Sequence, residues 1–267
     1  MKFRSRSFVE KKKVKRKMFF WVFSISTLAF LGFFFWFIYA DIFQIKETVI
    51  KGNSYVEEVS IREIIDRKIN EKTLGFIPHT NILFFPKAEI LNEIRSIAPV
   101  KSVKYSRADN TVEFQIEERV PSYVYCEGDY PTDDTCYFAD EMGFVFLKSP
   151  AFNNYPYLRL YAKINTFASS SVGVTVRDKS DIDFAHSVVD YLASKDINSD
   201  AISFGSDSIY FTINIGDALI YVAYKDNLES FKSKFEAITK DKDAKKFLES
   251  LKYLDLRLNT KVFLKEK

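Results

Sequence analysis

Asp255 and Arg257 stand two residues apart in the segment KYLDLRLNTKVFLKEK, residues 252–267. An acid beside a base could move a proton in catalysis, or it could simply form an ion pair. The segment alternates apolar and polar side chains, which is typical of a half-buried strand, and residues two apart on a strand share a face. We therefore interpret Asp255 and Arg257 as neighbours on the polar face. The apolar face would hold Leu254, Leu256, Leu258, Val262 and Leu264.

Other residues able to do chemistry are few and scattered. Glu117 and Glu118 are adjacent on a predicted strand, so they face opposite ways and do not form a catalytic carboxylate pair. His79 and His186 are the two histidines, and neither has a Cys, His or Asp cluster at metal-ligand spacing nearby. No glycine-rich phosphate loop is present in the sequence. The sequence therefore predicts no catalytic, cofactor-binding or metal-binding residues, no cofactor and no enzyme activity.

The charge of the chain is unevenly distributed. Residues 1–40 contain nine of the 39 Lys and Arg residues and one of the 36 acidic residues, so the remainder carries a net charge of about −5. A nucleic-acid-binding protein would carry its positive charge on the folded body. The distribution therefore argues against a nucleic-acid partner and indicates a basic tail over residues 1–18.

An apolar segment follows the basic tail. Residues 19–39 contain no formal charge, and as a helix they would extend about 31 Å, close to the thickness of a bilayer core. The alternative is a cleaved signal peptide, but such an apolar region is usually shorter and ends at small residues, unlike Phe37-Ile38-Tyr39-Ala40. We predict one uncleaved transmembrane helix. The basic tail places the N-terminus in the cytoplasm and residues 41–267 outside it.

Cys126 and Cys136 are the two cysteines, and both lie on the predicted extracytoplasmic side. Disulfides form and persist in such compartments, and the intervening EGDYPTDDT is polar and turn-prone. We predict a disulfide between them, with two reduced cysteines as the alternative.

Hydrophobic periodicity predicts a first folded region with the order β-α-α-β-β. Two helices on one face of a three-stranded sheet would bury one common core. The first helix has two alternative capping boxes, Ser54 with Glu57 and Ser60 with Glu63. The predicted elements are a strand within 43–53, helices at 55–69 and 86–99, and strands at 100–107 and 111–119.

The second region is predicted to be strand-rich with helices, so the fold class of the chain is α+β. Short strands surround the cysteine loop, and the last segment, 252–267, is predicted as a strand at the edge of the sheet. The other predicted elements are strands within 136–147, 155–162, 172–178, 201–205, 208–216 and 218–225, a helix at 180–197 with Ser180 as its N-cap, a helix at 227–240 and a short helix near 247–251.

Three short motifs occur in a fixed order after the β-α-α-β-β region. With the basic tail and the apolar segment, they resemble the FtsQ/DivIB family of bacterial cell-division proteins. The resemblance covers nearly the whole chain, and the Cys126–Cys136 loop departs from the usual pattern of the family. The motif residues are Ile116, Glu118, Arg119 and Pro121, then Asp140, Gly143, Val145 and Phe146, and finally Tyr253, Asp255, Leu256 and Arg257.

The resemblance implies a POTRA domain over residues 42–120 and a β domain over 121–267 that ends in an edge strand. It also implies a non-enzymatic membrane scaffold at the division septum that binds FtsB/FtsL-like proteins and no small-molecule substrate. The partner would add a strand beside the C-terminal strand, which fits the unpaired N–H and C=O groups of a sheet edge. The implied partner-binding residues are Arg257, Leu258, Asn259, Thr260, Lys261 and Val262.

Two alternatives come from other classes of protein. A membrane-anchored cell-wall enzyme would need a nucleophile or a carboxylate pair, and the sequence offers none. A transport component bearing a POTRA domain would need a β-barrel of many alternating strands, which the mixed helix and strand pattern after residue 120 does not match.

Overall fold

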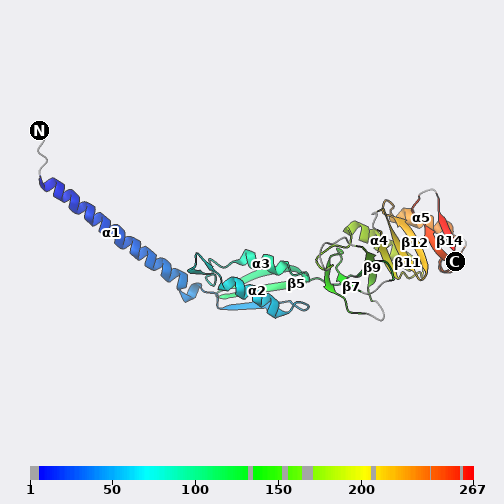
Figure 1. Cartoon of the computed structure of the whole chain (residues 1–267), viewed down its shortest axis with the longest axis horizontal. Helices are drawn as coiled ribbons and strands as arrows, with labels where there is room; N and C mark the ends of the chain where they lie inside the picture. The colour runs from blue at the N-terminus through cyan, green and yellow to red at the C-terminus, as the bar shows by residue number, and fades with distance from the viewer. Residues whose placement is uncertain are drawn as a thin grey trace, which may run out of the picture. The chain divides into compact units, whose positions relative to one another are not determined.

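The protein is described from a computed structural model, shown in Figure 1. It describes residues 6–131, 135–151, 156–163, 171–205, 209–240, 242–258 and 261–267, with side chains from residue 17 onward. The chain divides into two compact units, residues 1–118 (the first unit) and residues 119–267 (the second unit). Each unit is described separately.

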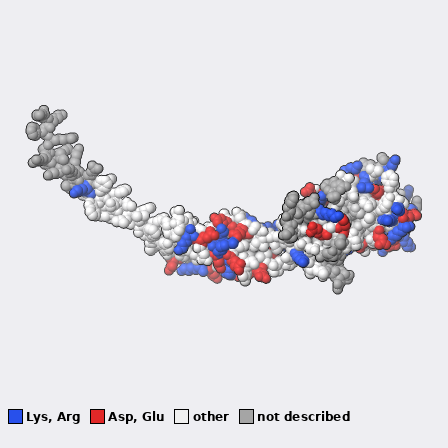
Figure 2. Space-filling view, in the orientation of Figure 1, with Lys and Arg blue, Asp and Glu red and all other residues white. Residues whose placement is uncertain are grey.

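The first unit begins with the long helix α1, Arg6–Tyr39. Among the described residues, its segment Lys17–Tyr39 is the one helical stretch long and apolar enough to cross a membrane. Beyond Lys17 this stretch contains no Lys, Arg, Asp or Glu, and Figure 2 shows most of it in white, with charged residues again over the folded part of the unit. The predicted N-terminal apolar helix is therefore confirmed, whereas its insertion and orientation in a membrane remain predictions.

Side-chain amides hold the C-terminal end of α1. The last carbonyl groups of a helix have no partner within the helix. Here the carbonyl oxygen of Ile38 accepts hydrogen bonds from Asn81 Nδ2, at 3.0 Å, and from Gln44 Nε2, at 2.6 Å. Asn81 and Ile38 are both fully buried. The end of α1 is therefore attached to the folded part of the first unit.

The folded part of the first unit is a three-stranded sheet with two helices. The strand order is β1-β5-β4, with β1 parallel and β4 antiparallel to β5. Val112, Phe114 and Ile116 alternate along β5 and are buried, as the period of two predicts. The elements are η1 Asp41–Phe43, β1 Glu47–Lys51, α2 Glu58–Asn70, a small hairpin of β2 Lys72–Thr73 and β3 Ile77–Pro78, α3 Lys87–Arg95, β4 Val100–Ala108 and β5 Thr111–Glu118.

Neither predicted capping box forms at the start of α2. Its N-cap is Glu57, whose side chain makes no capping hydrogen bond. The carboxylate of Glu118 instead accepts hydrogen bonds from the backbone N–H groups of Tyr55 and Val56, both at 2.8 Å, and these two residues precede the N-cap. This long-range contact positions the chain just before α2, whereas the helix itself receives no side-chain cap.

The second unit is built on a sheet of nine described strands in the order β14-β13-β12-β11-β10-β9-β6-β7-β8. Together with the first unit, this confirms the α+β class and the strand-rich character of the region. The elements are β6 Tyr123–Glu127, β7 Cys136–Ala139, β8 Val145–Lys148, β9 Leu158–Ala162, α4 Lys179–Ala193, β10 Ala201–Phe204, β11 Tyr210–Ile215, β12 Ala218–Ala223, α5 Leu228–Thr239, α6 Ala244–Glu249, β13 Leu251–Asp255 and β14 Phe263–Glu266.

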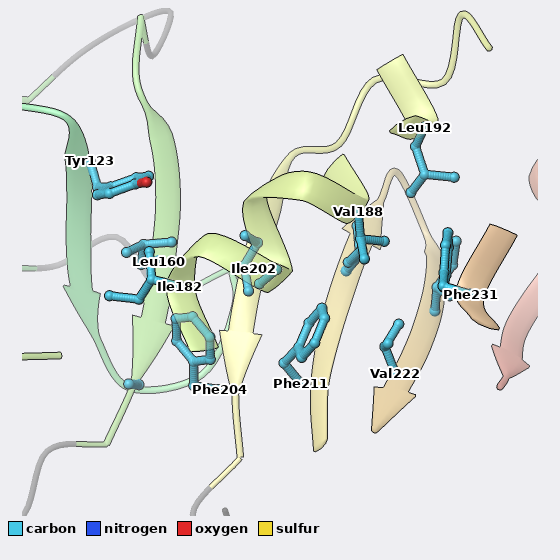
Figure 3. Packing of buried hydrophobic residues seen from close by; sticks show 14 of the residues in the cluster. Tyr123, Leu160, Ile182, Val188, Leu192, Ile202, Phe204, Phe211, Val222 and Phe231 are labelled. Atoms are coloured by element: carbon cyan, nitrogen blue, oxygen red, sulfur yellow. The ribbon is translucent and has the colours of Figure 1, made fainter. Parts of the chain in front are cut away.

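The core of the second unit lies between the sheet and its helices. Figure 3 shows α4 laid across the strands, with Val188 facing Phe211 and Ile202. On the strands, every second residue points into this core, as in Phe211 and Ile213 of β11. Burial of these aliphatic and aromatic side chains supplies the main stabilisation of the unit.

Two local predictions in the second unit were wrong. Helix α4 begins after Asp178, which is its N-cap, and not after Ser180. Residues 172–178 form no strand, and Thr175 makes only an isolated bridge to Phe144. Val145 donates a backbone hydrogen bond to Val174, so this segment borders β8 without continuing as a strand.

The C-terminal segment is not the single strand that its alternation predicts. Strand β13 ends at Asp255, and β14 begins at Phe263 and pairs antiparallel with β13. Leu254 and Leu256 are buried as predicted, but Leu258, Val262 and Leu264 are exposed, because the chain reverses beyond the helix-covered face. Of the residues that the resemblance implies as partner-binding, Arg257, Leu258, Lys261 and Val262 lie between strands, and Asn259 and Thr260 lie outside the described residues.

Candidate partner-binding edge

Strand β14 forms one edge of the nine-stranded sheet, and all four of its residues are exposed. The backbone N–H of Lys267 donates to the carbonyl oxygen of Ser250, so Lys267 faces β13. Along a strand, successive residues direct their N–H and C=O groups to opposite sides in the plane of the sheet. Leu264 and Glu266 therefore direct theirs away from the sheet. In the described part of the chain, β13 is the one strand that pairs with β14.

Exposed apolar side chains surround this edge. Phe263 and Leu264 are 49% and 43% exposed, and Leu258 and Ile209 are also exposed. A pocket of about 500 Å³ lies beside Phe263, with Asp255 and Arg257 in its wall. The edge thus combines free backbone groups with apolar surface, the two features that strand addition requires. The lining residues are Ile209, Ala223, Lys225, Asp255, Arg257, Leu258 and Phe263.

Asp255 and Arg257 form a bidentate ion pair. The Arg257 Nε and Nη2 atoms donate to the two carboxylate oxygens of Asp255 at 2.9 and 2.6 Å. The backbone N–H of Arg257 also donates to Asp255 Oδ1, at 3.1 Å. These hydrogen bonds from Arg257 hold the pKa of Asp255 below its ordinary value, although partial burial opposes the shift. The pair holds the chain where it leaves β13, and the predicted structural interpretation agrees with this geometry.

Tyrosine rings flank the guanidinium of Arg257. It lies 4.7 Å from the ring centroid of Tyr210 and 5.1 Å from that of Tyr221. Tyr221 also packs against Tyr253 on β13. Sequence reasoning missed this cluster. The signal was present, because Tyr221 and Tyr253 alternate with core residues on their strands and so belong to the face opposite the helices.

The structure brings two of the sequence motifs together. Asp140 is 5% exposed and accepts a hydrogen bond from Arg119 Nη1. Its second carboxylate oxygen accepts from the backbone N–H groups of Met142 and Phe144, and the Arg119 guanidinium lies 4.0 Å from the Phe144 ring centroid. This arrangement fixes the turn between β7 and β8. Its chemistry is that of a satisfied ion pair between a buried carboxylate and a partly buried guanidinium.

Gly143 lies in the same turn and has a φ of +74°. A Cβ atom there would lie 2.3 Å from the Cδ1 atom of Ile182, which is fully buried on α4. The turn can therefore approach α4 this closely only with glycine at this position.

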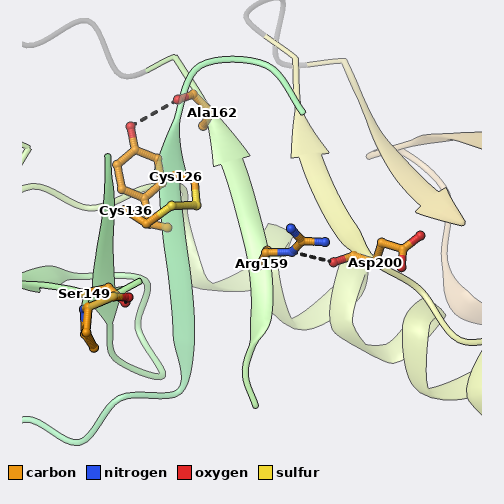
Figure 4. Close-up of a disulfide and its surroundings, with 8 residues drawn as sticks. Cys126, Cys136, Ser149, Arg159, Ala162 and Asp200 are labelled. Atoms are coloured by element: carbon orange, nitrogen blue, oxygen red, sulfur yellow. Dashed lines mark hydrogen bonds between the residues drawn. A yellow bond between two sulfur atoms is a disulfide. The ribbon is translucent and has the colours of Figure 1, made fainter. Parts of the chain in front are cut away.

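Cys126 and Cys136 are bonded to each other, as predicted (Figure 4). They lie directly opposite on β6 and β7 with their Cα atoms 4.2 Å apart. The neighbouring Tyr125 hydroxyl donates to the carbonyl oxygen of Ala162 on β9, at 3.1 Å. The disulfide therefore ties the two strands at the start of the loop that joins them.

The two histidines are both engaged within their units. His79 contacts Thr73 Oγ1 at 2.9 Å and the carbonyl oxygen of Lys68 at 2.8 Å, and His186 contacts the Tyr123 hydroxyl at 3.2 Å. Over the described residues, no three His, Cys, Asp or Glu side chains are grouped as metal ligands would be.

No protein-family model and no curated protein matches this sequence. The functional assignment therefore rests on the order of the elements, the motifs and the geometry of the β14 edge.

Proposed function

We propose that this protein is a membrane-anchored, non-enzymatic scaffold of the bacterial division machinery, of the FtsQ/DivIB type. In this role it recruits and regulates FtsB/FtsL-like partners during septum formation. The observation that carries the proposal is the order of parts: an apolar N-terminal helix, a β-α-α-β-β unit, and a strand-rich unit with an exposed edge strand.

The topology of the first unit supports a POTRA assignment. Two helices, α2 and α3, share one core with a three-stranded sheet in which the first strand, β1, lies parallel to the last strand, β5. Its place directly after α1 would bring it close to the membrane. There it could contact other membrane-anchored division proteins.

The contact between Arg119 and Asp140 also supports the proposal. Arg119 belongs to the motif that ends the β-α-α-β-β region, and Asp140 belongs to the next motif along the chain. Each motif is short and therefore unspecific by itself. The ion pair between the partly buried Arg119 and the buried Asp140 gives a physical reason for both motifs to occur in one chain.

The proposed partner site is β14 and not residues 257–262. Leu264 and Glu266 direct free backbone groups outward, so an added strand would pair with them. Lys261, Lys265 and Lys267 surround this edge and outnumber Glu266. A partner segment that is extended and acidic, with apolar residues for Phe263 and Leu264, has the complementary chemistry.

Localisation and depletion in the native host test this function. A fluorescent fusion of the full chain is expected to collect at the division site, and depletion is expected to give long, undivided cells. A fusion that lacks residues 263–267 loses β14 but keeps β13 with its buried Leu251 and Leu254, and it should fail to restore division. An even envelope signal together with normal division after depletion would exclude the scaffold.

A further inference from the structure

The small hairpin β2–β3 lies against the C-terminal end of α1, where the loops of the first unit meet the helix in Figure 1. The Tyr39 hydroxyl donates to the carbonyl oxygen of Phe76, and the rings of Phe76 and Phe35 have their centroids 6.0 Å apart. Asn81, which follows the hairpin, donates to the carbonyl oxygen of Ile38. The hairpin is therefore held beside the last turn of the apolar helix.

The position of Phe35 fixes the depth of this contact. Phe35 precedes Tyr39, the last residue of the apolar segment, by four residues, which is about 6 Å along a helix. A residue that packs on Phe35 therefore lies level with the apolar segment and not beyond its end. Phe76 is in this position.

The tip of the hairpin is apolar and fully open. Leu74 is 79% exposed, and it forms the tip with Gly75 and Phe76. Leu74 and Gly75 both have positive φ, at 55° and 80°. Leucine is unfavourable in this left-handed conformation, so the sequence places a large apolar side chain outward at a position that favours glycine or asparagine. Residues 73–78 carry no charge.

Two further apolar side chains extend the surface. Ile42 in η1 lies three residues beyond Tyr39, the end of α1, and Leu83 follows the hairpin; both are exposed. Lys72 is exposed at the base of the hairpin, where an ammonium group could meet lipid phosphates while the apolar tip lies deeper. Scattered apolar residues are normal on a surface, but these are joined to a helix of membrane-spanning length.

We propose that the hairpin Lys72–Pro78, with Ile42 and Leu83, is a second membrane contact that enters the boundary between lipid headgroups and acyl chains. The occupant is the bilayer that α1 crosses, because the apolar surface continues directly from the apolar helix. This inference rests on the membrane insertion of α1 in the proposed function. It adds that the folded part of the first unit lies on the lipid surface through its hairpin.

Spin labelling of the full chain tests the inference. The chain is reconstituted in vesicles of phosphatidylcholine and phosphatidylglycerol, with a spin label at Leu74→Cys, Leu28→Cys or Val59→Cys. Cys126 and Cys136 are bonded to each other and do not take the label under non-reducing conditions. Val59 is the control, since it is also open to solvent, at 63% against 79% for Leu74, but lies at the start of α2, the opposite end of that helix from the hairpin.

Collision rates with oxygen, which concentrates in lipid, and with a water-soluble nickel chelate report the environment of each label. The label at Leu74→Cys is expected to have an oxygen collision rate between that of Leu28→Cys, at the middle of the apolar segment, and that of Val59→Cys. Its accessibility to the nickel chelate should be about tenfold lower than that of Val59→Cys, which corresponds to about 1.4 kcal/mol of partitioning. If the Leu74 variant does not fold, Leu83→Cys replaces it with the same expectation.

The outcomes separate this inference from the proposed function. If Leu28→Cys is in lipid and Leu74→Cys is as accessible to nickel as Val59→Cys, the hairpin contact is wrong and the membrane span stands. If Leu28→Cys is also in water, α1 does not cross the membrane, and both proposals are overturned.

Discussion

Arg257 binds Asp255 through two parallel hydrogen bonds, and this pair lies where the chain leaves β13 and turns toward the exposed strand β14. The planar guanidinium matches the carboxylate, and the Tyr210 ring lies 4.7 Å from it. The chain reverses between Asp255 and Phe263. These two residues pair across β13 and β14, so both ends of the reversal are held to the sheet. The ion pair therefore helps to position the candidate partner-binding edge.

The Asp255–Arg257 pair predicts a loss of stability in acid. The folded state holds the pKa of Asp255 below its unfolded value of about 3.9, so the stabilisation is fully present above that pH and is lost as the pH falls through the folded pKa. Asp255→Asn should therefore be less stable than the wild type at neutral pH, with a difference that shrinks below about pH 4. Pulse proteolysis of the full chain in urea at several pH values measures this. A difference that stays constant with pH would contradict it.

Leu264→Pro should weaken partner binding without unfolding the second unit. Leu264 directs its N–H away from β13, so proline removes a donor for the added strand and no hydrogen bond of the β13–β14 ladder. Loss of one such bond costs about 1 kcal/mol, or about fivefold in affinity. Capture of FtsB/FtsL-like partners by the tagged full chain measures the effect.

Leu264→Ala is the control for the lost side chain, because it keeps the N–H group. Equal binding by Leu264→Pro and Leu264→Ala would argue against strand addition at β14. Lys265→Pro provides a second comparison. Its N–H faces β13, so this variant should loosen β14 and make it sensitive to protease.

Gly143→Ala should destabilise the second unit more than Gly173→Ala. Both glycines have positive φ, at 74° and 92°, so alanine is unfavourable at either by about 1 kcal/mol. Only Gly143 has a close neighbour, Ile182, and the resulting overlap should add about 2 kcal/mol. Urea unfolding of the two variants separates the steric contact from the backbone conformation, and equal losses would disprove close packing of the turn on α4.

Removal of the disulfide should also destabilise the second unit. Cys126 and Cys136 are ten residues apart, and closing a loop of that length restricts the unfolded chain by about 3 kcal/mol. Dithiothreitol should lower the unfolding midpoint of the wild type in urea. The double variant Cys126→Ala, Cys136→Ala should start at the lower midpoint and show no response to the reductant. A response of the double variant would mean that the reductant acts elsewhere.

Helices and central strands were predictable because burial repeats with a fixed period in them. Ile61 and Ile65 on α2, and Val112 and Phe114 on β5, are all buried where the period places them. Each of these elements turns one face to one core, so its buried positions recur at a regular spacing in the sequence. The class of fold followed from this signal, whereas the candidate membrane helix followed from the length of the uncharged segment 19–39.

The C-terminal reversal was not predictable from the same signal. The alternation that begins at Leu254 continues through Leu258 to Leu264. One continuous strand and two strands joined by a reversal between Asp255 and Phe263 would show the same alternation. The alternation alone does not show which apolar residues face a core. Leu256 is buried and Leu258 exposed, a difference set by the edge of the helix layer.

The capping boxes predicted for α2 were wrong for a related reason. Glu118 lies 63 and 62 residues along the chain from Tyr55 and Val56, whose backbone N–H groups it binds. No local motif encodes such a contact. The Arg119–Asp140 pair is likewise a long-range relationship, and the two motifs gave its residues without indicating that they touch.

The hydrogen bonds from Asn81 and Gln44 to Ile38 have a mechanical consequence. Successive residues of an α-helix point about 100° apart, so α1 cannot turn about its axis or slide by one residue without breaking both bonds. The C-terminal end of α1 is therefore held against rotation relative to the folded part of the first unit. Torque applied to the helix would pass directly into the sheet and helices of the first unit.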